Sequence, residues 1–449
     1  MANGLAAEQT AGYFRLNRTH EAYMFYFYFE NRAADSEAPL VVWMTGGPGC
    51  SSELAVFYEN GPYTITKDLS LKTNPYGWDQ TANMIYVDQP IGTGFSYSED
   101  ERDRVFDERV VGLDMLDFLL EFLEARPQYQ DRDFYVTGES YAGHYVPAVS
   151  HRIYSYNKNV APEKQINLKG LAIGNGLTNP AIQYGAYADY ALLNKIIGQA
   201  THSAIKSVYP VCKIGLELCN AAPGVPLLCS LALTFCQSTQ FGGVMAVAGD
   251  MNVYDIRKPC VGALCYDFSR LDKYLAQPDV RDKLGVGDRE WTECNFDVNA
   301  DFLSDWPLNY DTSLIPLLES DIRVTIYAGV EDFICNWLGN KRWVDLLPWS
   351  GNAAWKLQPE QSWTLNDTVV GSARQLGNLN FIKINGAGHM VPMDQPAAAL
   401  DMFTRFLRNE TFPGSAAADA SRLPLVTTKE LDVQYRSVFA PLRRAMPSA

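Results

Sequence analysis

Short apolar runs bounded by Gly, Asp or Pro constrain the fold of this chain more than any other feature. Continuous runs of this length suit strands of a parallel sheet that is buried on both faces. Between two of the runs, the segment 105–126 has apolar residues at helical spacing and stops before Pro127. Strand, helix and strand in this order predict a right-handed parallel crossover. The runs are PLVVWM at 39–44, NMIYVD at 83–88, DFYVTG at 133–138 and LKGLAIGNG at 168–176.

The pattern is interrupted after Pro180 and returns with RVTIYAG at 323–329 and LNFIKINGAG at 379–388. An aromatic strand at 22–30 should pair with the segment around 13–16. We therefore predict an α/β fold with a mostly parallel central sheet and an inserted, disulfide-rich cap. The core would comprise residues 1–180 and 301–413 and the cap residues 181–300, followed by a tail at 414–449 whose structure the sequence does not specify.

The charge of the chain argues against nucleic acid as a partner. The net charge is −15 and the pI is about 4.8, whereas phosphate contacts need clustered Lys and Arg. No segment approaches the roughly 18–20 apolar residues of a membrane span. The chain opens with MANGLAAEQTAGYF, which lacks the basic and apolar regions of a signal peptide. Because the cysteines indicate export, we expect a targeting segment to have been trimmed.

The chain has nine cysteines, six of which lie within residues 212–265. Their spacing is not that of a zinc site, and this stretch contains no His to share ligation. An even cluster in a loop-rich stretch predicts disulfides, and therefore an oxidising compartment. The odd total leaves one thiol free. Three N-x-Thr triplets agree with export as acceptors of N-linked glycans, and they begin at Asn17, Asn366 and Asn409.

A candidate nucleophile, Ser140, lies in the segment GESYAG at 138–143, which follows the third apolar run. The segment is a variant of G-x-S-x-G, with Ala142 in the place of the second glycine and Gly143 one residue further on. A sharp turn from strand to helix, closed by small residues, would raise Ser140 above the edge of the sheet. The helix would extend up to Pro147. The alternative is a glycine-rich turn with a capping serine, but the position between a strand and a helix favours the nucleophile.

A serine nucleophile needs donors for the oxyanion that forms on its substrate. One donor should be the backbone N–H of Tyr141, the residue after the serine. The other should come from the loop TGGPGCSS at 45–52, which directly follows the first run. Gly47 is the natural choice because no side chain blocks a close approach. The loop could also cradle a phosphate, but it lacks the Lys-Ser/Thr ending of a phosphate-binding loop.

The general base should be a histidine after a late strand. Among five histidines, His389 follows the run FIKINGAG and fits this position. His144 lies on the same predicted helix as Ser140 and should be packed there, and the other three lack a preceding strand. The orienting acid should come between serine and histidine in the chain. Asp332 follows the strand RVTIYAG, with Glu331 beside it as the competing carboxylate.

Six segments together resemble the serine carboxypeptidases, a family with the α/β-hydrolase fold, over residues from about 11 to 412. The stretch at 43–62 looks closest to the plant-type serine carboxypeptidase III. The segments are GGPGCSS at 46–52, VDQPIGTGFSYS at 87–98, GESYAGHYVP at 138–147, AIGNGLTNP at 172–180, ICNWLGN at 334–340 and GAGHMVP at 386–392.

The resemblance implies an enzyme that removes single residues from peptide C-termini through an acyl-enzyme on Ser140, favoured at acidic pH and without a cofactor or metal. Its triad and oxyanion residues match those chosen above. It also implies that Glu59 and Glu139 hold the terminal carboxylate of the substrate. Thr45 stands where many members of the family have Asn. A threonine cannot reproduce the two-sided hydrogen bonding of an amide.

The resemblance further implies two side-chain pockets and a pattern of disulfides. The pocket for the leaving residue would contain Phe57 and Met390, and that for the preceding residue Leu177, Tyr184, Tyr187, Trp306, Ile334 and Cys335. Aromatic and aliphatic residues at such positions belong to the hydrophobic core as often as to a substrate pocket. Cys335 would be the free thiol, and the pairs would be Cys50–Cys294, Cys212–Cys236, Cys219–Cys229 and Cys260–Cys265.

Two other functions use the same scaffold. Related plant acyltransferases tend to have Asp where this chain has Glu139, and a silent binding or protective protein would be expected to lose a member of the triad. Neither feature is present in this sequence. The expected protein binds peptide or protein C-termini as a monomer or homodimer. It would belong to the secretory pathway, in a vacuole, a lysosome-like compartment or outside the cell.

Overall fold

The structure is a computed structural model that describes residues 7–262 and 264–412, so the predicted tail at 414–449 lies outside the described residues. Its main feature is an 11-stranded sheet, in which the short β7 (Tyr97–Ser98) pairs with β2. From edge to edge, the sheet contains β1 (Gln9–Arg15), β2 (Ala22–Phe29), β6 (Asn83–Val87), β3 (Leu40–Met44), β8 (Phe134–Glu139), β9 (Leu168–Gly174), β10 (Arg323–Gly329), β13 (Leu379–Ile384), β12 (Thr368–Leu376) and β11 (Gln361–Leu365).

The centre of this sheet is parallel and its edges are antiparallel. Strands from β6 to β13 in the order above run in parallel, and they include all the apolar runs predicted as buried strands. At one edge β1 pairs with β2 as predicted, and β2 is antiparallel to β6. At the other edge, the β11–β12 hairpin was not predicted. A second, small hairpin joins β4 (Tyr63–Ile65) and β5 (Leu71–Thr73).

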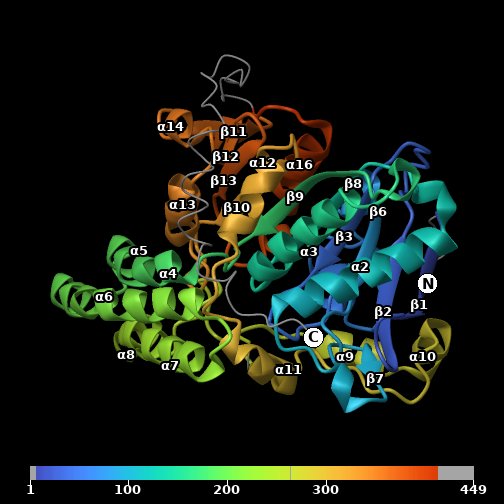
Figure 1. Cartoon of the computed structure of the whole chain (residues 1–449), viewed down its shortest axis with the longest axis horizontal. Helices are drawn as coiled ribbons and strands as arrows, with labels where there is room; N and C mark the ends of the chain where they lie inside the picture. Colours follow the sequence, from blue (N-terminus) through green and yellow to red (C-terminus); the bar gives the residue numbers. More distant parts are fainter. Residues whose placement is uncertain (1–6, 263, 413–449) are drawn as a thin grey trace, which may run out of the picture.

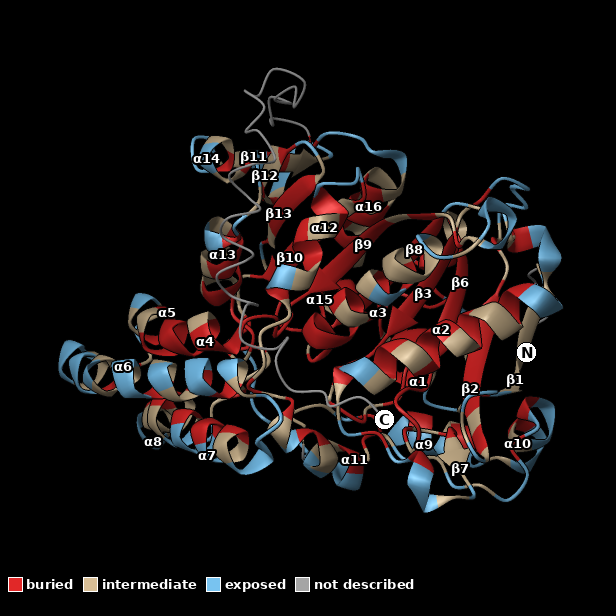
Figure 2. Ribbon diagram, in the orientation of Figure 1, coloured by how far each residue is buried: buried red, intermediate tan, exposed pale blue. Residues whose placement is uncertain are grey.

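Each face of the sheet is covered by its own apolar layer, as Figure 2 shows by the buried strands between helices. Along β2, Met24 and Tyr26 join one layer, whereas Phe25 and Phe27 join the other. This alternation is the period of two that any strand imposes on its side chains. The central strands are therefore apolar at every position, which is why they were visible in the sequence.

Helices cover both faces of the sheet, and α2 and α3 lie side by side across one of them (Figure 1). The other face packs against α1, α9, α10 and α16. The α-helices are α1 (Glu53–Tyr58), α2 (Glu108–Ala125), α3 (Ala142–Asn157), α4 (Pro180–Gln183), α5 (Tyr187–Leu193), α6 (Gln199–Ala221), α7 (Pro226–Cys236), α8 (Gly242–Ala248), α9 (Ser269–Leu275), α10 (Pro278–Leu284), α11 (Phe296–Asp301), α12 (Ile315–Leu318), α13 (Trp337–Leu346), α14 (Asn352–Trp355), α15 (Val391–Asp394) and α16 (Pro396–Arg408).

The helix after the candidate nucleophile is longer than predicted, because α3 continues through Pro147 to Asn157. A proline inside a helix removes one hydrogen bond and costs about 3 kcal/mol. Three fully buried residues on the same helix, Val146, Val149 and Ile153, pack into the layer beneath the sheet. Each buried aliphatic side chain contributes about 1.5–3 kcal/mol, so packing outweighs the lost bond.

Within the segment 181–300, α6, α7 and α8 lie to the side of the sheet (Figure 1), whereas α9 and α10 pack against one of its faces. Two disulfides, Cys212–Cys236 and Cys219–Cys229, join α6 to α7. Cys260–Cys265 closes a short loop, and Cys50–Cys294 ties the glycine-rich loop to a distant segment. These are the pairs implied by the resemblance. Among the described helices, none has the length and apolar character that crossing a membrane would require.

Candidate active site

Ser140 lies on the tight turn between β8 and α3, at the carboxyl end of the central sheet. Its backbone is left-handed, with φ of 66°, and its side chain is half-buried. The turn is fixed from a neighbouring strand, because the Ser140 N–H donates to the carbonyl of Gly174 at 3.0 Å. A strained residue held by its surroundings at a strand end is typical of a presented nucleophile.

The glycine-rich loop approaches this turn so closely that Gly46 admits no side chain. A Cβ atom at Gly46 would lie 2.4 Å from the backbone nitrogen of Tyr141 and 2.7 Å from the Ser140 Cβ. Gly47 has φ of +114°, a conformation that favours glycine. The loop thereby brings the predicted donors, Gly47 and Tyr141, to one cavity. The sequence analysis missed Gly46, although the double glycine in this loop was a signal for it.

The acid and the base of the predicted triad are in contact. His389 Nδ1 lies 3.0 Å from Asp332 Oδ2. The other ring nitrogen, Nε2, is therefore the atom that can act on the serine. Asp332 is fully buried, and its carboxylate accepts the backbone N–H groups of Ile334 and Cys335 at 3.2 Å each. His389 and Ser140 line the same cavity. The competing carboxylate Glu331 has no side-chain bond to His389 among the described contacts, so the geometry favours Asp332.

His144 is packed inside the protein, on the helix that follows Ser140. Its ring is fully buried, stacks on Tyr141 with centroids 4.5 Å apart, and contacts the carbonyl oxygens of Leu177 and Trp306. Burial lowers the pKa of His144 to about 4. Because both ring nitrogens face backbone carbonyls, neither is available as a base.

The active-site cavity has a volume of about 320 Å³ and a largely aromatic wall. Its lining residues come from the loops that follow the central strands β3, β8, β9, β10 and β13, and from the segment between β9 and β10. Helical residues that the sequence analysis did not name also take part, among them Gln237 and Phe241, which follow the Cys212–Cys236 disulfide. The predicted residues that line it are Thr45, Leu177, Tyr184, Tyr187, Trp306, Ile334, Cys335 and Met390.

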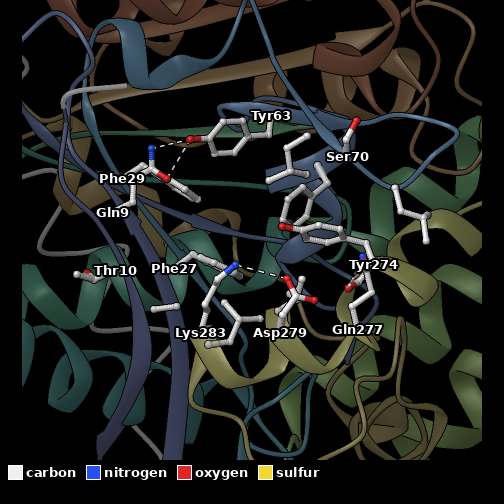
Figure 3. Close-up of a pocket in the computed structure, with 16 residues that line it drawn as sticks. Gln9, Thr10, Phe27, Phe29, Tyr63, Ser70, Tyr274, Gln277, Asp279 and Lys283 are labelled. Carbon is white, nitrogen blue, oxygen red and sulfur yellow. Dashed lines mark hydrogen bonds and ion pairs between the residues drawn. The ribbon is translucent and has the colours of Figure 1, made fainter. Parts of the chain in front are cut away.

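Phe57, on α1, lines a different cavity, also of about 320 Å³. Figure 3 shows this cavity with Phe27, Tyr63 and Tyr274 in its wall. The Phe57 ring is 5.4 Å from that of Tyr274 and 6.3 Å from that of Phe27. The neighbour that faces the active-site cavity from the same helix is Leu54. Residues three apart lie only about 60° apart around a helix, yet these two side chains reach different cavities. The structure thus separates Phe57 from Met390.

Glu59 and Glu139 form a buried pair of carboxyl groups beside the catalytic turn. Glu59 ends α1 and Glu139 ends β8, and both are at most 4% exposed. Burial raises the pKa of Glu59 to about 8, and burial together with Glu59 raises the pKa of Glu139 well above its usual range. Neither oxygen of Glu59 has a hydrogen-bond donor among the described groups. At a pH where ordinary carboxyl groups are ionised, this pair therefore retains protons.

Thr45, in the glycine-rich loop, lines the same cavity as Glu139. Its hydroxyl accepts a hydrogen bond from Trp43 Nε1 at 3.0 Å, and its own proton remains available. Thr45 therefore offers a single donor into the cavity.

Two more buried acid pairs surround the site. Burial raises the pKa of Glu53 and, with the neighbouring Glu53, that of Asp88. Burial also raises the pKa of Asp305 to about 7 and, with Asp305 nearby, that of Glu108. Asp305 accepts the Tyr141 hydroxyl at 2.9 Å, so this pair lies behind the predicted oxyanion donor.

We expect these pairs to make the protein more stable in acid than in alkali. Raised pKa values mean that the folded protein binds more protons than the unfolded chain, so stability falls as the pH rises. The stabilisation from these protons is complete below the ordinary carboxyl pKa of about 4. It is lost as the pH rises through the raised pKa values, and that of Glu59 is about 8. The melting temperature should fall by about 5–10 °C between about pH 5 and pH 8.

Thermal unfolding at a series of pH values measures this slope. Glu108→Gln should reduce it, because an amide replaces the protonated acid at every pH. A melting temperature that is constant or rises over the same interval would contradict the proton uptake.

A model of the serine carboxypeptidase family matches residues 1–409. The chain belongs to this family. It is 50% identical over 400 residues to serine carboxypeptidase 3 of Hordeum vulgare, covering 89% of this chain and 78% of that protein. It is 38% identical over 398 residues to carboxypeptidase Y of Candida albicans, covering 87% and 71% of the two chains.

A solved structure shares the fold. Kex1Δp, a prohormone-processing carboxypeptidase from Saccharomyces cerevisiae, superimposes with a TM-score of 0.80. The match covers 90% of this chain and 92% of that chain, at 24% sequence identity. The family and its α/β fold therefore agree with the expectations drawn from the six sequence segments.

Proposed function

We propose that this serine carboxypeptidase family member hydrolyses the C-terminal peptide bond of peptides and proteins through an acyl-enzyme on Ser140. The observation that carries the proposal is the buried Glu59–Glu139 pair next to the Ser140 turn. A protonated carboxyl group donates a strong hydrogen bond to a carboxylate, which a free C-terminus supplies. An endopeptidase or esterase has no need of such a pair beside its nucleophile.

We infer the reaction from the proposed triad, whose Ser140 and His389 line the same cavity. His389 Nε2 takes the proton from the Ser140 hydroxyl, while Asp332 holds the opposite ring nitrogen. The Ser140 oxygen attacks the scissile carbonyl, and the N–H groups of Gly47 and Tyr141 stabilise the oxyanion. His389 then protonates the leaving amino group, and the same base activates the water that hydrolyses the acyl-enzyme.

The cavity supports apolar side chains on the substrate. Its wall is formed by Tyr, Trp, Phe, Leu and Ile residues, and Glu139 is the one acidic side chain among the described residues that line it. The wall residues around Tyr184 and Ile334 suit the residue before the scissile bond, and Met390 suits the leaving residue. Cys335 is free and buried, and burial with the neighbouring Asp332 raises the pKa of its thiol. The thiol therefore acts through its size and not as a nucleophile.

Acyl transfer to an alcohol is the competing reaction on this scaffold. It uses the same acyl-enzyme, so the fate of the acyl group distinguishes the two. A blocked dipeptide ester incubated with an excess of a neutral alcohol should yield mainly the free acid and, from the matching peptide, free amino acid. A transfer product that exceeds the hydrolysis product by about tenfold would favour the acyltransferase.

We also propose a secretory-pathway location, in a vacuole or lysosome-like compartment or outside the cell, because four disulfides persist in oxidising compartments. The three glycan acceptors Asn17, Asn366 and Asn409 are all exposed, which a glycan requires. The division into a core and a cap at 181–300 remains our proposal, supported by the helical character of α4 to α8.

A further inference from the structure

A buried asparagine, Asn175, lies where the loops of the nucleophile and of the acid meet. It follows the last residue of β9, is 0% exposed, and has a left-handed backbone with φ of 40°. We propose that Asn175 is a positioning residue, which holds the Asp332 carboxylate in the orientation that His389 needs. This inference rests on the triad assigned under the proposed function.

The orientation of the Asn175 amide is fixed by the chemistry of its neighbours. The backbone N–H of Gly329 lies 3.0 Å from Oδ1, and since an N–H can only donate, the amide oxygen must face it. The NH₂ group therefore faces Asp332, with Nδ2 donating to Oδ2 at 2.8 Å. The amide therefore holds the same carboxylate oxygen that contacts His389 Nδ1 at 3.0 Å.

Asn175 differs from the other donors to Asp332 in where it comes from. The backbone N–H groups of Ile334 and Cys335 belong to the same loop as Asp332 and move with it. Asn175 is attached to β9, and its own backbone N–H donates to the carbonyl of Tyr327 on β10 at 2.8 Å. It thus ties the loop that carries the acid to the frame of the sheet.

The same short segment also holds the nucleophile. The carbonyl of Gly174 accepts the Ser140 N–H at 3.0 Å, and the Leu177 N–H donates to the Ser140 carbonyl at 3.0 Å. Residues 174–177 therefore contact both the serine turn and the acid, with Asn175 between the two contacts. A shift of about 1 Å between catalytic groups can cost about 100-fold in rate.

The identity of the residue follows from two requirements that must be met together. A left-handed backbone is tolerated by Gly, Asn and Asp, and the amide contact excludes Gly and ionised Asp. Asn409 offers a comparison, because it is also left-handed, with φ of 55°, but it is exposed at the end of α16. Its backbone needs the same residue type, whereas no catalytic group needs its side chain.

Three variants test the proposal with an uncharged ester substrate, which avoids the Glu59–Glu139 pair. Asn175→Gly keeps the backbone and removes the donor, so kcat should fall about 100-fold at every pH while KM changes less than about threefold. Asn175→Asp places a second carboxyl beside Asp332, where one proton is shared at low pH and restores a donor. Its kcat should approach that of the parent in acid and fall about 100-fold as the pH rises. Asn409→Asp is the control and, with all proteins freed of N-linked glycans, should behave as the parent.

The parent-to-variant ratio of kcat at each pH isolates the effect of the residue at position 175. The other titratable groups near this position are the same in both proteins. They are Asp332 and Cys335 after β10, His389 after β13, Glu139 on β8 and Tyr327 on β10. Each kcat is calculated from the concentration of folded protein, which is the fraction that unfolds cooperatively on heating. A kcat within about threefold of the parent for Asn175→Gly, or a pH-independent ratio for Asn175→Asp, would overturn the proposal. An inactive parent protein would instead overturn the proposed function.

Discussion

Replacing Ser140 with alanine is expected to lower kcat by about a million-fold, as removal of a serine nucleophile does in other triad enzymes. The variant loses the atom that forms the acyl-enzyme, whereas the oxyanion donors and the cavity remain. It should also lose labelling by a fluorophosphonate. Ester and peptide hydrolysis, measured with the labelled fraction, test this expectation, and thermal unfolding shows whether the fold is kept.

The two buried histidines provide the matched control. His389→Ala should reduce kcat about as far as Ser140→Ala, because the two residues act as one unit. His144→Ala removes a packed ring that faces two backbone carbonyls, so it should affect stability more than turnover of the folded protein. Loss of activity in His144→Ala with activity retained in His389→Ala would show that the triad is misassigned.

The second large effect concerns the paired carboxyl groups. Replacing both Glu59 and Glu139 with glutamine should remove the preference of peptide substrates for acidic pH. In the parent, the pair is protonated below its raised pKa values, about 8 for Glu59, and donates to the substrate carboxylate. As the pH rises through these values the pair ionises and repels the carboxylate. Hydrogen bonds to charged groups contribute about 1.5–3 kcal/mol, so KM should rise about 10- to 100-fold in the parent.

Glutamine donates hydrogen bonds at every pH, so the double variant should keep a nearly constant KM for free peptides over the same interval. Glu108→Gln is the control, because Glu108 belongs to a buried acid pair that does not face the substrate carboxylate. Its KM should rise with pH as in the parent. A KM that rises equally in the double variant would remove Glu59 and Glu139 from carboxylate binding.

The central strands could be predicted from the sequence because both faces of each are buried. Val41 and Val42, for example, point to opposite sides of β3 and are both fully buried, which produces an uninterrupted apolar run. The edge hairpin β11–β12 has one partly exposed face and mixed polar residues, so its sequence gave no comparable run. The length of α3 was underestimated because packing of Ile153 outweighs Pro147, and packing is a property of the whole fold.

The catalytic residues were predictable to the extent that each follows a recognisable strand. Ser140 and His389 could be chosen because strand-end loops carry them, and Asp332 was separated from Glu331 only by the hydrogen bond to His389. Asn175 also follows a predicted strand, but nothing in the sequence indicated its contact with Asp332, which lies 157 residues away. Phe57 was misplaced because its side of α1 depends on the packing of the helix against Tyr274.

The central claim is that a protonated acid pair beside a serine nucleophile selects peptides with a free C-terminus. The most direct test measures kcat/KM against pH for one blocked dipeptide and for its C-terminal amide. Any requirement for a neutral His389 affects both substrates, so it cancels in the ratio. We predict a ratio that favours the free acid in acidic solution and falls about 10- to 100-fold as the pH rises past about 8. A ratio that is constant with pH would contradict the account.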